Sequence, residues 1–533
     1  MHAVPDGHPR LFLYDTTLRD GAQRRGLNFS LSDKLRITQL LDAFGVDYIE
    51  GGWPGSNPKD EDYFAQVRDL PLKHARIAAF GSTRRVGKHV GDDTQLRSLI
   101  AAQTPVVTMV GKSWALHVTD VLRTTLEENL NLIRDSIAFI KDAGREVIFD
   151  AEHFFDGFRA DPDYALACLN AAAEAGADSV VLCDTNGGSL PQWIAQVTTR
   201  VVRNVKVNVG VHTHNDAELA VANALAAVQA GARQIQGTIN GYGERCGNAN
   251  LVSLLPTLVY KLNYQAQAAA HLRELTRLSR QIAELANVTP DAFAPYVGSN
   301  AFTHKGGIHA SAVARLASSY EHLPPELIGN HNDIVVSELA GWSNVLARAQ
   351  TLGIQLHEHD KTLLQEIKQK EARGVHLEAA EGSFELLLRR REQAFEPAFV
   401  LEDFRVESRR HQQQEMACQA TCKLRIGHET LLTAAEAQGP VAAIDAALRK
   451  ALVPYWPELH DVKLSDYTVR ILDAENATAA TTRVIIEAVW REQTWRTVGA
   501  SENIIDASAQ ALVESFELFI LKRRGQHYGD TAA

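Results

Sequence analysis

Short apolar segments alternate with longer segments of helical periodicity between residue 10 and about residue 260. The apolar segments are continuous runs, which is typical of parallel strands covered on their outer face. Eight strand–helix units in about 250 residues predict an α/β fold of the (β/α)8 TIM-barrel type, with a doubly wound sheet as the less favoured alternative. The predicted strands are Leu11–Tyr14, Tyr48–Gly51, Arg76–Phe80, Val106–Val110, Glu146–Asp150, Ser179–Cys183, Val205–Val211 and Arg233–Thr238.

The segments between the strands carry apolar residues at helical spacing. Several of them end at a glycine, which is favoured at the C-terminus of a helix. Clear cases are Leu31–Phe44, Leu126–Ala143, Tyr164–Ala175 and Leu219–Ala230. This regular alternation supports the barrel.

The pattern changes twice after the barrel, so we expect three domains, with the barrel at residues 10–262. Residues 263–396 are predicted to be mainly helical linker subdomains. Residues 397–525 combine alternating strand-like segments with amphipathic helices and are predicted to form an α+β domain. Its predicted elements are the strands Ala417–Ile426, Thr468–Leu472, Arg483–Trp490 and Thr494–Val498 and the helices Pro440–Leu452 and Asp506–Leu521.

Composition indicates the cellular compartment of the chain and excludes some classes of partner. The 533 residues carry a formal net charge of −11, which argues against non-specific binding to nucleic acid or to an anionic membrane. The five cysteines are odd in number and lack zinc-ligand spacing, as expected for free thiols in a reducing compartment. The N-terminus has no apolar signal core, and no run of about 20 apolar residues occurs. We therefore expect a cytoplasmic protein.

Three polar segments follow predicted barrel strands: Leu18–Gly21, His212–Asp216 and Gly241–Asn248. The loops after the strands all lie at one face of a barrel, where catalytic groups are found. His212 and His214 are two residues apart at a strand end, so both can reach one ion, and Asp20 supplies an anionic oxygen. Asn248 could approach the same ion. Such a ligand set suits Mg²⁺, Mn²⁺, Zn²⁺ or Fe²⁺. The alternative for Asp20 is a loop ion pair with Arg19.

Other residues of the same face could act on a substrate. Arg19 could stabilise an alkoxide that forms on a ketone oxygen. Glu152 is the best candidate for a general base, with Asp150 and His153 as competitors and a structural ion pair as the alternative role. Thr185 could donate a hydrogen bond to a substrate carboxylate or could cap the next helix.

The eighth loop, with Gly241, Gly243 and Gly247, has the backbone freedom that close approach of a ligand requires. Its spacing is Gly-x-Gly-x-x-x-Gly, whereas a dinucleotide-binding turn needs Gly-x-Gly-x-x-Gly, so we discard dinucleotide binding by this loop.

With these residues identified, the chain resembles the metal-dependent acyl-CoA condensing enzymes that include the 2-isopropylmalate, homocitrate and citramalate synthases. The matching stretches are Asp15–Gln23, His212–Ala249, Gly439–Val441, Asp466–Arg470 and Thr497–Ile505. The second-strand loop, Gly51–Asp60, looks most like the long citramalate synthase branch. One departure is Glu218, where the wider family usually has glycine.

The resemblance implies that Asp20, His212 and His214 hold the metal, Mg²⁺ or Mn²⁺ first and Zn²⁺ as the alternative. It implies that Arg19, Asp20 and Thr185 meet the oxo acid and that Glu152 moves the proton. The eighth loop, through Gly241, Gly243, Glu244 and Asn248, is expected to meet acetyl-CoA. A further histidine comes from the partner subunit in this family, and His309 matches its position.

The implied activity is condensation of acetyl-CoA with pyruvate to give citramalate, as part of isoleucine biosynthesis. Residues 397–525 are then a regulatory, dimerising domain, with isoleucine as the expected effector of a homodimer. Trp53 could fill a small pyruvate pocket or could only pack the barrel. The rival activities are 2-isopropylmalate synthesis from 2-oxoisovalerate, a metal-dependent lyase reaction, and a non-catalytic amino-acid sensor.

Overall fold

The computed structural model describes residues 9–304, 312–313, 315–331, 333–334, 342–356, 361–392, 395–409, 417–472, 480–491 and 493–529. The chain divides into two compact units. The first comprises Met1–Phe302 and Leu323–His331, and the second comprises Thr303–His322 and Asn332–Ala533.

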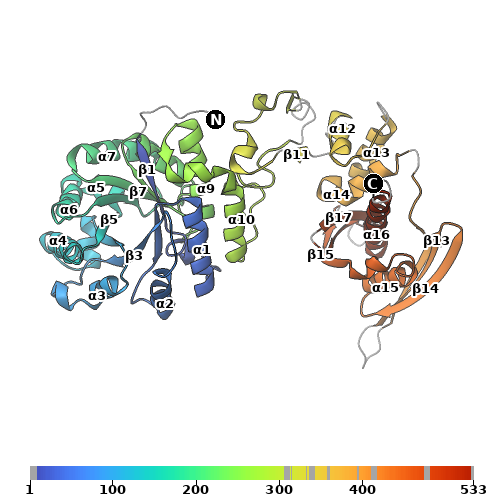
Figure 1. The fold of residues 1–533 in the computed structure, drawn as a ribbon, viewed down its shortest axis with the longest axis horizontal. Coiled ribbons are helices and arrows are strands. Elements are labelled where there is room, and N and C mark those ends of the chain that lie inside the picture. Colours follow the sequence, from blue (N-terminus) through green and yellow to red (C-terminus); the bar gives the residue numbers. More distant parts are fainter. Residues whose placement is uncertain are drawn as a thin grey trace. The chain divides into compact units, whose positions relative to one another are not determined.

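The first unit is built on a closed parallel barrel (Figure 1). Closure is made by β1, which pairs with β8 through Phe12 and Gln234 and with β2 through Tyr14 and Tyr48. The predicted TIM barrel is therefore confirmed. Its strands are β1 (Arg10–Asp15), β2 (Tyr48–Gly52), β3 (Arg76–Ser82), β4 (Val106–Lys112), β5 (Glu146–Glu152), β6 (Ser179–Asp184), β7 (Asn208–Thr213) and β8 (Gln234–Gly237).

Helices follow the strands and cover the outside of the barrel (Figure 1). The first of them illustrates how the sequence sets their ends. Ser30 and Asp33 form a reciprocal capping box at its start, and Gly45 ends it with a φ of 91°, a conformation that favours glycine. The helices are α1 (Leu31–Phe44), α2 (Pro58–Val67), α3 (Thr94–Ala101), α4 (Leu126–Asp142), α5 (Phe154–Ala160), α6 (Pro162–Glu174), α7 (Pro191–Asn204) and α8 (Ala220–Gln229).

The main core of the first unit continues beyond the barrel. Helices α9 (Leu251–Pro256) and α10 (Leu275–Leu285) follow β8, with a short strand β9 (Gln265–Ala266) between them that pairs with β1. Leu275 and Ile282 of α10 belong to the same hydrophobic core as the barrel. A separate small cluster, which includes Tyr14 and Cys183, packs inside the barrel.

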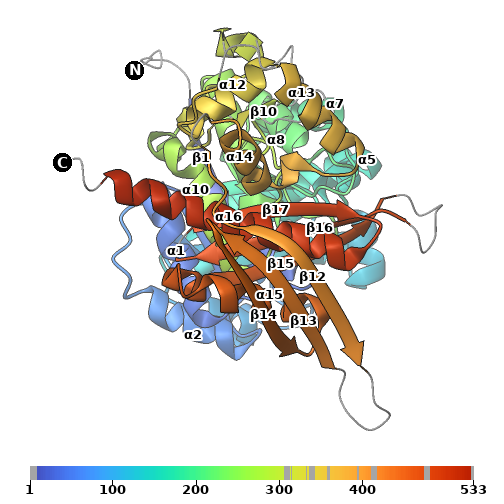
Figure 2. The ribbon, with the colours of Figure 1, turned by 90° about the vertical axis from the view of Figure 1, so that its right-hand side faces the viewer.

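In the second unit, the helices of residues 342–389 precede two sheets. Two antiparallel three-stranded sheets occupy its C-terminal part, with α15 packed on β13 and β14 and α16 packed on β16 and β17 (Figure 2). The predicted α+β domain is thus observed. The elements are β10 (Thr303–His304), β11 (Asp333–Ile334), α12 (Trp342–Thr351), α13 (Lys361–Ala372), α14 (Glu381–Arg389), β12 (Val400–Arg409), β13 (Ala417–Ile426), β14 (Glu429–Ala437), α15 (Pro440–Leu452), β15 (Lys463–Ile471), β16 (Thr482–Trp490), β17 (Gln493–Ser501) and α16 (Ile504–Gly529).

The predicted domain limits of 10–262, 263–396 and 397–525 stay a prediction. Within the described residues, no helix combines the length and the apolar character that a membrane span requires.

Candidate active site

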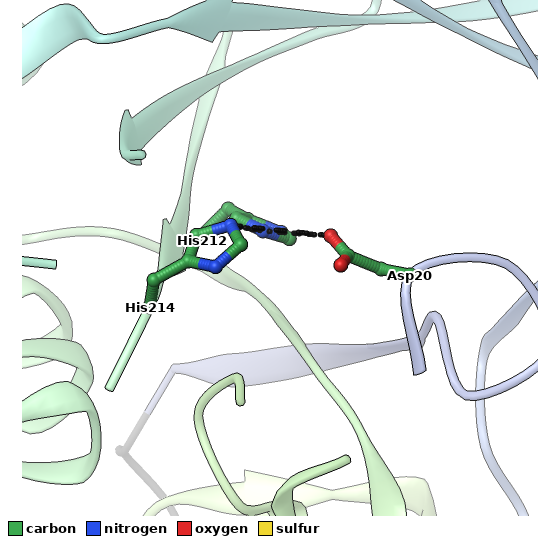
Figure 3. A group of neighbouring side chains, drawn as sticks. All are labelled: Asp20, His212 and His214. Carbon is green, nitrogen blue, oxygen red and sulfur yellow. Dashed lines mark hydrogen bonds and ion pairs between the residues drawn. The ribbon is translucent and has the colours of Figure 1, made fainter. Parts of the chain in front are cut away.

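Asp20, His212 and His214 form a buried cluster at the carboxyl ends of the barrel strands. Asp20 lies in the loop after β1, His212 is the second-last residue of β7, and His214 lies one residue beyond that strand. Because side chains alternate along a strand, both imidazoles point to the same side (Figure 3). The two Nε2 atoms are 3.1 Å apart, and Oδ2 of Asp20 lies 3.4 Å from the Nε2 of His212.

The electrostatic surroundings favour an ionised Asp20. Burial alone would raise the pKa of this carboxyl, but the positive charge of Arg19, the largest of the opposing effects, helps to hold the pKa well below its usual range. Burial, followed by the neighbouring His212, lowers the pKa of His214 to about 3. An anionic oxygen beside a neutral imidazole is the state in which these groups bind a metal.

These residues fit a divalent cation. Each of the three side chains offers one ligand atom, and these atoms all lie within 4.8 Å of one another. Oδ1 of Asp20 and Oδ1 of Asn248 are buried, and neither has a hydrogen-bond partner in the described part of the chain. Asn248 forms a β-bridge with His214 and donates its Nδ2 to the carbonyl of Tyr242, which leaves the amide oxygen free. Buried oxygen atoms without a donor are typical of a site that a cation completes.

The Arg19 guanidinium is held from two sides. Its Nε donates to Oε1 of Glu50 in β2, and its Cζ lies 3.8 Å from the ring centroid of Phe80 in β3. Glu50 is fully buried and also accepts hydrogen bonds from Tyr14 and Thr16. Nη1 of Arg19 also donates to Asp20 at 3.2 Å, so the loop ion pair that we considered for Asp20 is present beside the histidine cluster. Sequence reasoning missed Glu50, although a glutamate inside a buried apolar strand is a usable signal.

The cluster opens into a cavity of about 470 Å³. Residues from the carboxyl ends of several strands surround it, as in a barrel active site. Among the residues proposed from the sequence, those that line it are Arg19, Asp20, Trp53, Asp150, Glu152, Thr185, His212, His214 and Glu244.

Glu152 lies at the end of β5 and forms an ion pair with Lys112 at the end of β4. Both side chains are about a quarter exposed and both line the cavity. The ion pair that we considered for Glu152 therefore exists, but it lies in the cavity, where the carboxylate can also reach a substrate.

Thr185 follows β6. Its hydroxyl oxygen accepts a hydrogen bond from the backbone N–H of His153 at 2.9 Å. The hydroxyl proton can still be donated to a ligand in the cavity. Nearby, Arg245 makes a bidentate ion pair with Asp216, with contacts of 2.7 and 2.9 Å.

The glycines of the eighth loop have a packing reason. A Cβ on Gly243 would lie 2.2 Å from Nδ2 of Asn248, and one on Gly247 would lie 2.1 Å from the carbonyl oxygen of Gly241. These glycines let the loop fold back on itself and place Asn248 beside His214. Gly241 and Gly243 are not among the residues that line the cavity, whereas Glu244 is.

Glu218 has a φ of 58°, in the left-handed region that favours glycine, which explains physically why relatives would carry glycine there. His309 lies outside the described residues.

Comparisons with known proteins identify the family of the chain. Residues 10–282 match the HMGL-like family, residues 296–374 match the post-HMGL domain of homocitrate synthase, and residues 378–520 match the LeuA allosteric (dimerisation) domain. A (R)-citramalate synthase of Synechocystis is 50% identical over 95% of this chain and 95% of its own length. The chain belongs to the citramalate synthase family. The (R)-citramalate synthase of Aquifex aeolicus is 49% identical over 96% of this chain and 98% of its own length.

A 2-isopropylmalate synthase of Methanocaldococcus jannaschii is more distant, with 32% identity over 98% of this chain and 96% of its own length. The family is metal-dependent and uses acetyl-CoA as co-substrate, and its members are transferases. The second-strand loop therefore indicated the correct branch.

Proposed function

We propose that this protein condenses acetyl-CoA with pyruvate to give citramalate and free CoA. The observation that carries the proposal is the buried cluster of Asp20, His212 and His214, which opens beside Arg19 into a cavity of about 470 Å³. Membership of the citramalate synthase family supplies the choice of pyruvate as the oxo acid.

In this proposal, Asp20, His212 and His214 hold a divalent ion, and Oδ1 of Asn248 faces the same site. We favour Mg²⁺ or Mn²⁺ over Zn²⁺. When bound, the ion would supply Lewis-acid chemistry that orients the oxo acid and makes its ketone more electrophilic. The burial of the ligands keeps bulk water from competing for them.

Arg19 stabilises the negative charge that develops on the ketone oxygen during attack. Glu50 and Phe80 fix its guanidinium, so no reorganisation is needed at that moment. Thr185 can donate its hydroxyl proton to the substrate carboxylate, because its oxygen is already oriented by His153.

Glu152 is the proposed base. It removes a proton from the acetyl methyl group, and the resulting carbanion forms a bond to the ketone carbon of pyruvate. Water then hydrolyses the thioester and releases the CoA thiol. His309, from the partner subunit, is proposed to assist. The eighth loop, through Gly241, Gly243, Glu244 and Asn248, is proposed to position acetyl-CoA.

The test is release of CoA thiol from acetyl-CoA, with pyruvate compared against 2-oxoisovalerate. With Mg²⁺ or Mn²⁺ we expect rapid release with pyruvate, and EDTA should abolish it. Preference for 2-oxoisovalerate would instead assign 2-isopropylmalate synthesis. Absence of release with every oxo acid would revive the sensor hypothesis.

The C-terminal residues 397–525 are proposed to bind isoleucine as a feedback inhibitor, in a homodimer located in the cytoplasm. The match of residues 378–520 to an allosteric dimerisation domain supports this. Isoleucine should inhibit the full-length enzyme, and a chain ending at residue 396 should lose that inhibition. Persistent inhibition of the shortened chain would place the effector elsewhere.

A further inference from the structure

Gln236 in β8 lies between His212 and Asp150 inside the barrel. Its Oε1 is 2.9 Å from Nδ1 of His212, and its Nε2 donates to Oδ1 of Asp150 at 2.9 Å. We infer that Gln236, oriented by Asp150, holds His212 in the tautomer that carries its proton on Nδ1, and so raises the metal affinity of the site. The inference rests on the metal site of the proposed function.

The orientation of the Gln236 amide follows from its two partners. The amide has one end that only accepts hydrogen bonds and one end that only donates them. In the structure, Nε2 of Gln236 donates to Oδ1 of Asp150, and this oxygen accepts both in the ionised carboxylate and in the acid whose proton lies on the other oxygen. The carbonyl end must then face His212, and only a protonated Nδ1 can donate to it.

The tautomer decides what His212 offers to the cluster. A neutral imidazole has one N–H, so a proton on Nδ1 leaves a lone pair on Nε2. That Nε2 atom faces Oδ2 of Asp20 at 3.4 Å and Nε2 of His214 at 3.1 Å. A metal needs this lone pair, and the hydrogen bond at Nδ1 provides it before the metal arrives.

Burial makes the two hydrogen bonds of Gln236 difficult to replace. His212, Gln236 and Asp150 are each at most 4% exposed, so bulk water cannot take the place of the amide. His214 differs, because its Nδ1 is buried with no hydrogen-bond partner among the residues that the structure describes. We therefore expect His212 to be preorganised in the metal-free protein and His214 to depend on the metal.

The experiment measures Mn²⁺ binding to metal-free full-length protein by electron paramagnetic resonance. Gln236→Met keeps the length of the side chain but removes both hydrogen bonds. We expect it to weaken Mn²⁺ binding by about 10- to 100-fold, as loss of a hydrogen bond to a ligating histidine does elsewhere. The matched control is the double variant Gln236→Glu with Asp150→Asn. In it, the glutamate accepts from His212 and the asparagine donates to the glutamate, so Mn²⁺ binding should return to near the wild-type value.

Wild-type affinity in Gln236→Met, or equally weak binding in the double variant, would overturn the inference. Circular dichroism of each variant controls for the fold. A second measurement needs no substitution of Gln236 or Asp150. It records the ¹⁵N chemical shifts of the metal-free wild type, and the signals of His212 are assigned as those that disappear in His212→Asn. A proton on Nδ1 is expected, and a proton on Nε2 would overturn the inference. A wild type that binds no Mn²⁺ but shows the Nδ1 proton would refute the proposed function alone.

Discussion

Arg19 and Glu50 form an ion pair between the loop after β1 and the interior of β2. Glu50 is fully buried, and the Arg19 side chain is only 13% exposed. A buried ion pair gives little net stability, because both charges lose their hydration. The ion pair is better explained by its effect on Arg19, because Glu50 holds the positively charged guanidinium at the cavity. The stability of the protein should nevertheless depend on both partners being present.

Glu50→Gln should show this dependence. The substitution leaves the Arg19 charge buried without its main partner, which costs about 3–5 kcal/mol in comparable cases. We expect a lower free energy of unfolding, measured by denaturant titration, and a higher KM for the oxo acid. Tyr14→Phe is the control, because it removes another hydrogen bond to Glu50 and keeps the ion pair. Equal effects of the two substitutions on KM would show that the charge of Glu50 does not position Arg19.

The ion pair of Lys112 with Glu152 allows a test of the proposed base. Glu152→Gln should keep metal and pyruvate binding and lose turnover by about 10²-fold or more, because the amide cannot accept the proton. Lys112→Met removes the same ion pair but leaves the carboxylate. If Glu152 is the base, this second variant should lose much less turnover, as measured by CoA release. If the ion pair is only structural, the two variants should lose activity together.

The fold could be predicted because buried parallel strands have an unmistakable pattern. The ends of strands are harder to predict where a helix ends only a few residues before the strand begins. The predicted strand at Val205–Val211 begins at Asn208, because the N–H of Val205 still bonds to Val201 at the end of α7. Strands β12 and β14 were not predicted. Many of their residues are exposed, so the apolar pattern is diluted by charged and small side chains.

The site could be predicted only where the residue type itself suggests the chemistry. Asp20, His212 and His214 are metal-ligand types at the ends of strands, and the barrel topology brings such ends together. A glutamate inside an apolar strand, such as Glu50, does not show which residue it contacts, and Gln236 gives no comparable signal. Their partners are 31 and 24 residues away in the sequence, and only the closed sheet determines which side chains meet.

Trp53 provides a test of oxo-acid specificity. Its ring packs edge-on against Phe80 at 5.3 Å between centroids, and both side chains line the cavity. Trp53→Ala should make room for a larger substrate, so the rate with 2-oxobutyrate relative to pyruvate should rise by roughly tenfold, since one methylene is worth about 1–3 kcal/mol. Trp53→Phe is the control and should change the ratio less. An unchanged ratio in Trp53→Ala, with a loss of stability, would show that Trp53 only packs the barrel.

The raised pKa of the buried Asp15 should make the stability of the barrel depend on pH. Its carboxylate accepts from the backbone and hydroxyl of Thr17, and the Thr17 hydroxyl accepts from the N–H of Ile239 beyond β8. Burial, the main cause, raises the pKa of Asp15 from 3.8 to about 7. The folded state therefore binds a proton that the unfolded state has lost between about pH 4 and pH 7. Stability from this group falls as pH rises through that window, by at most about 1.4 kcal/mol per pH unit.

The measurement for Asp15 is the difference in the free energy of unfolding between the wild type and Asp15→Asn at several pH values, which cancels the titration of other groups. Asparagine cannot titrate, so the advantage of the wild type should be largest near pH 4 and should shrink toward pH 7. A difference that is constant across this range, or that grows with pH, would show that Asp15 is ionised in the folded barrel. In that case, the hydrogen bonds from Thr17 outweigh the cost of burying the charge.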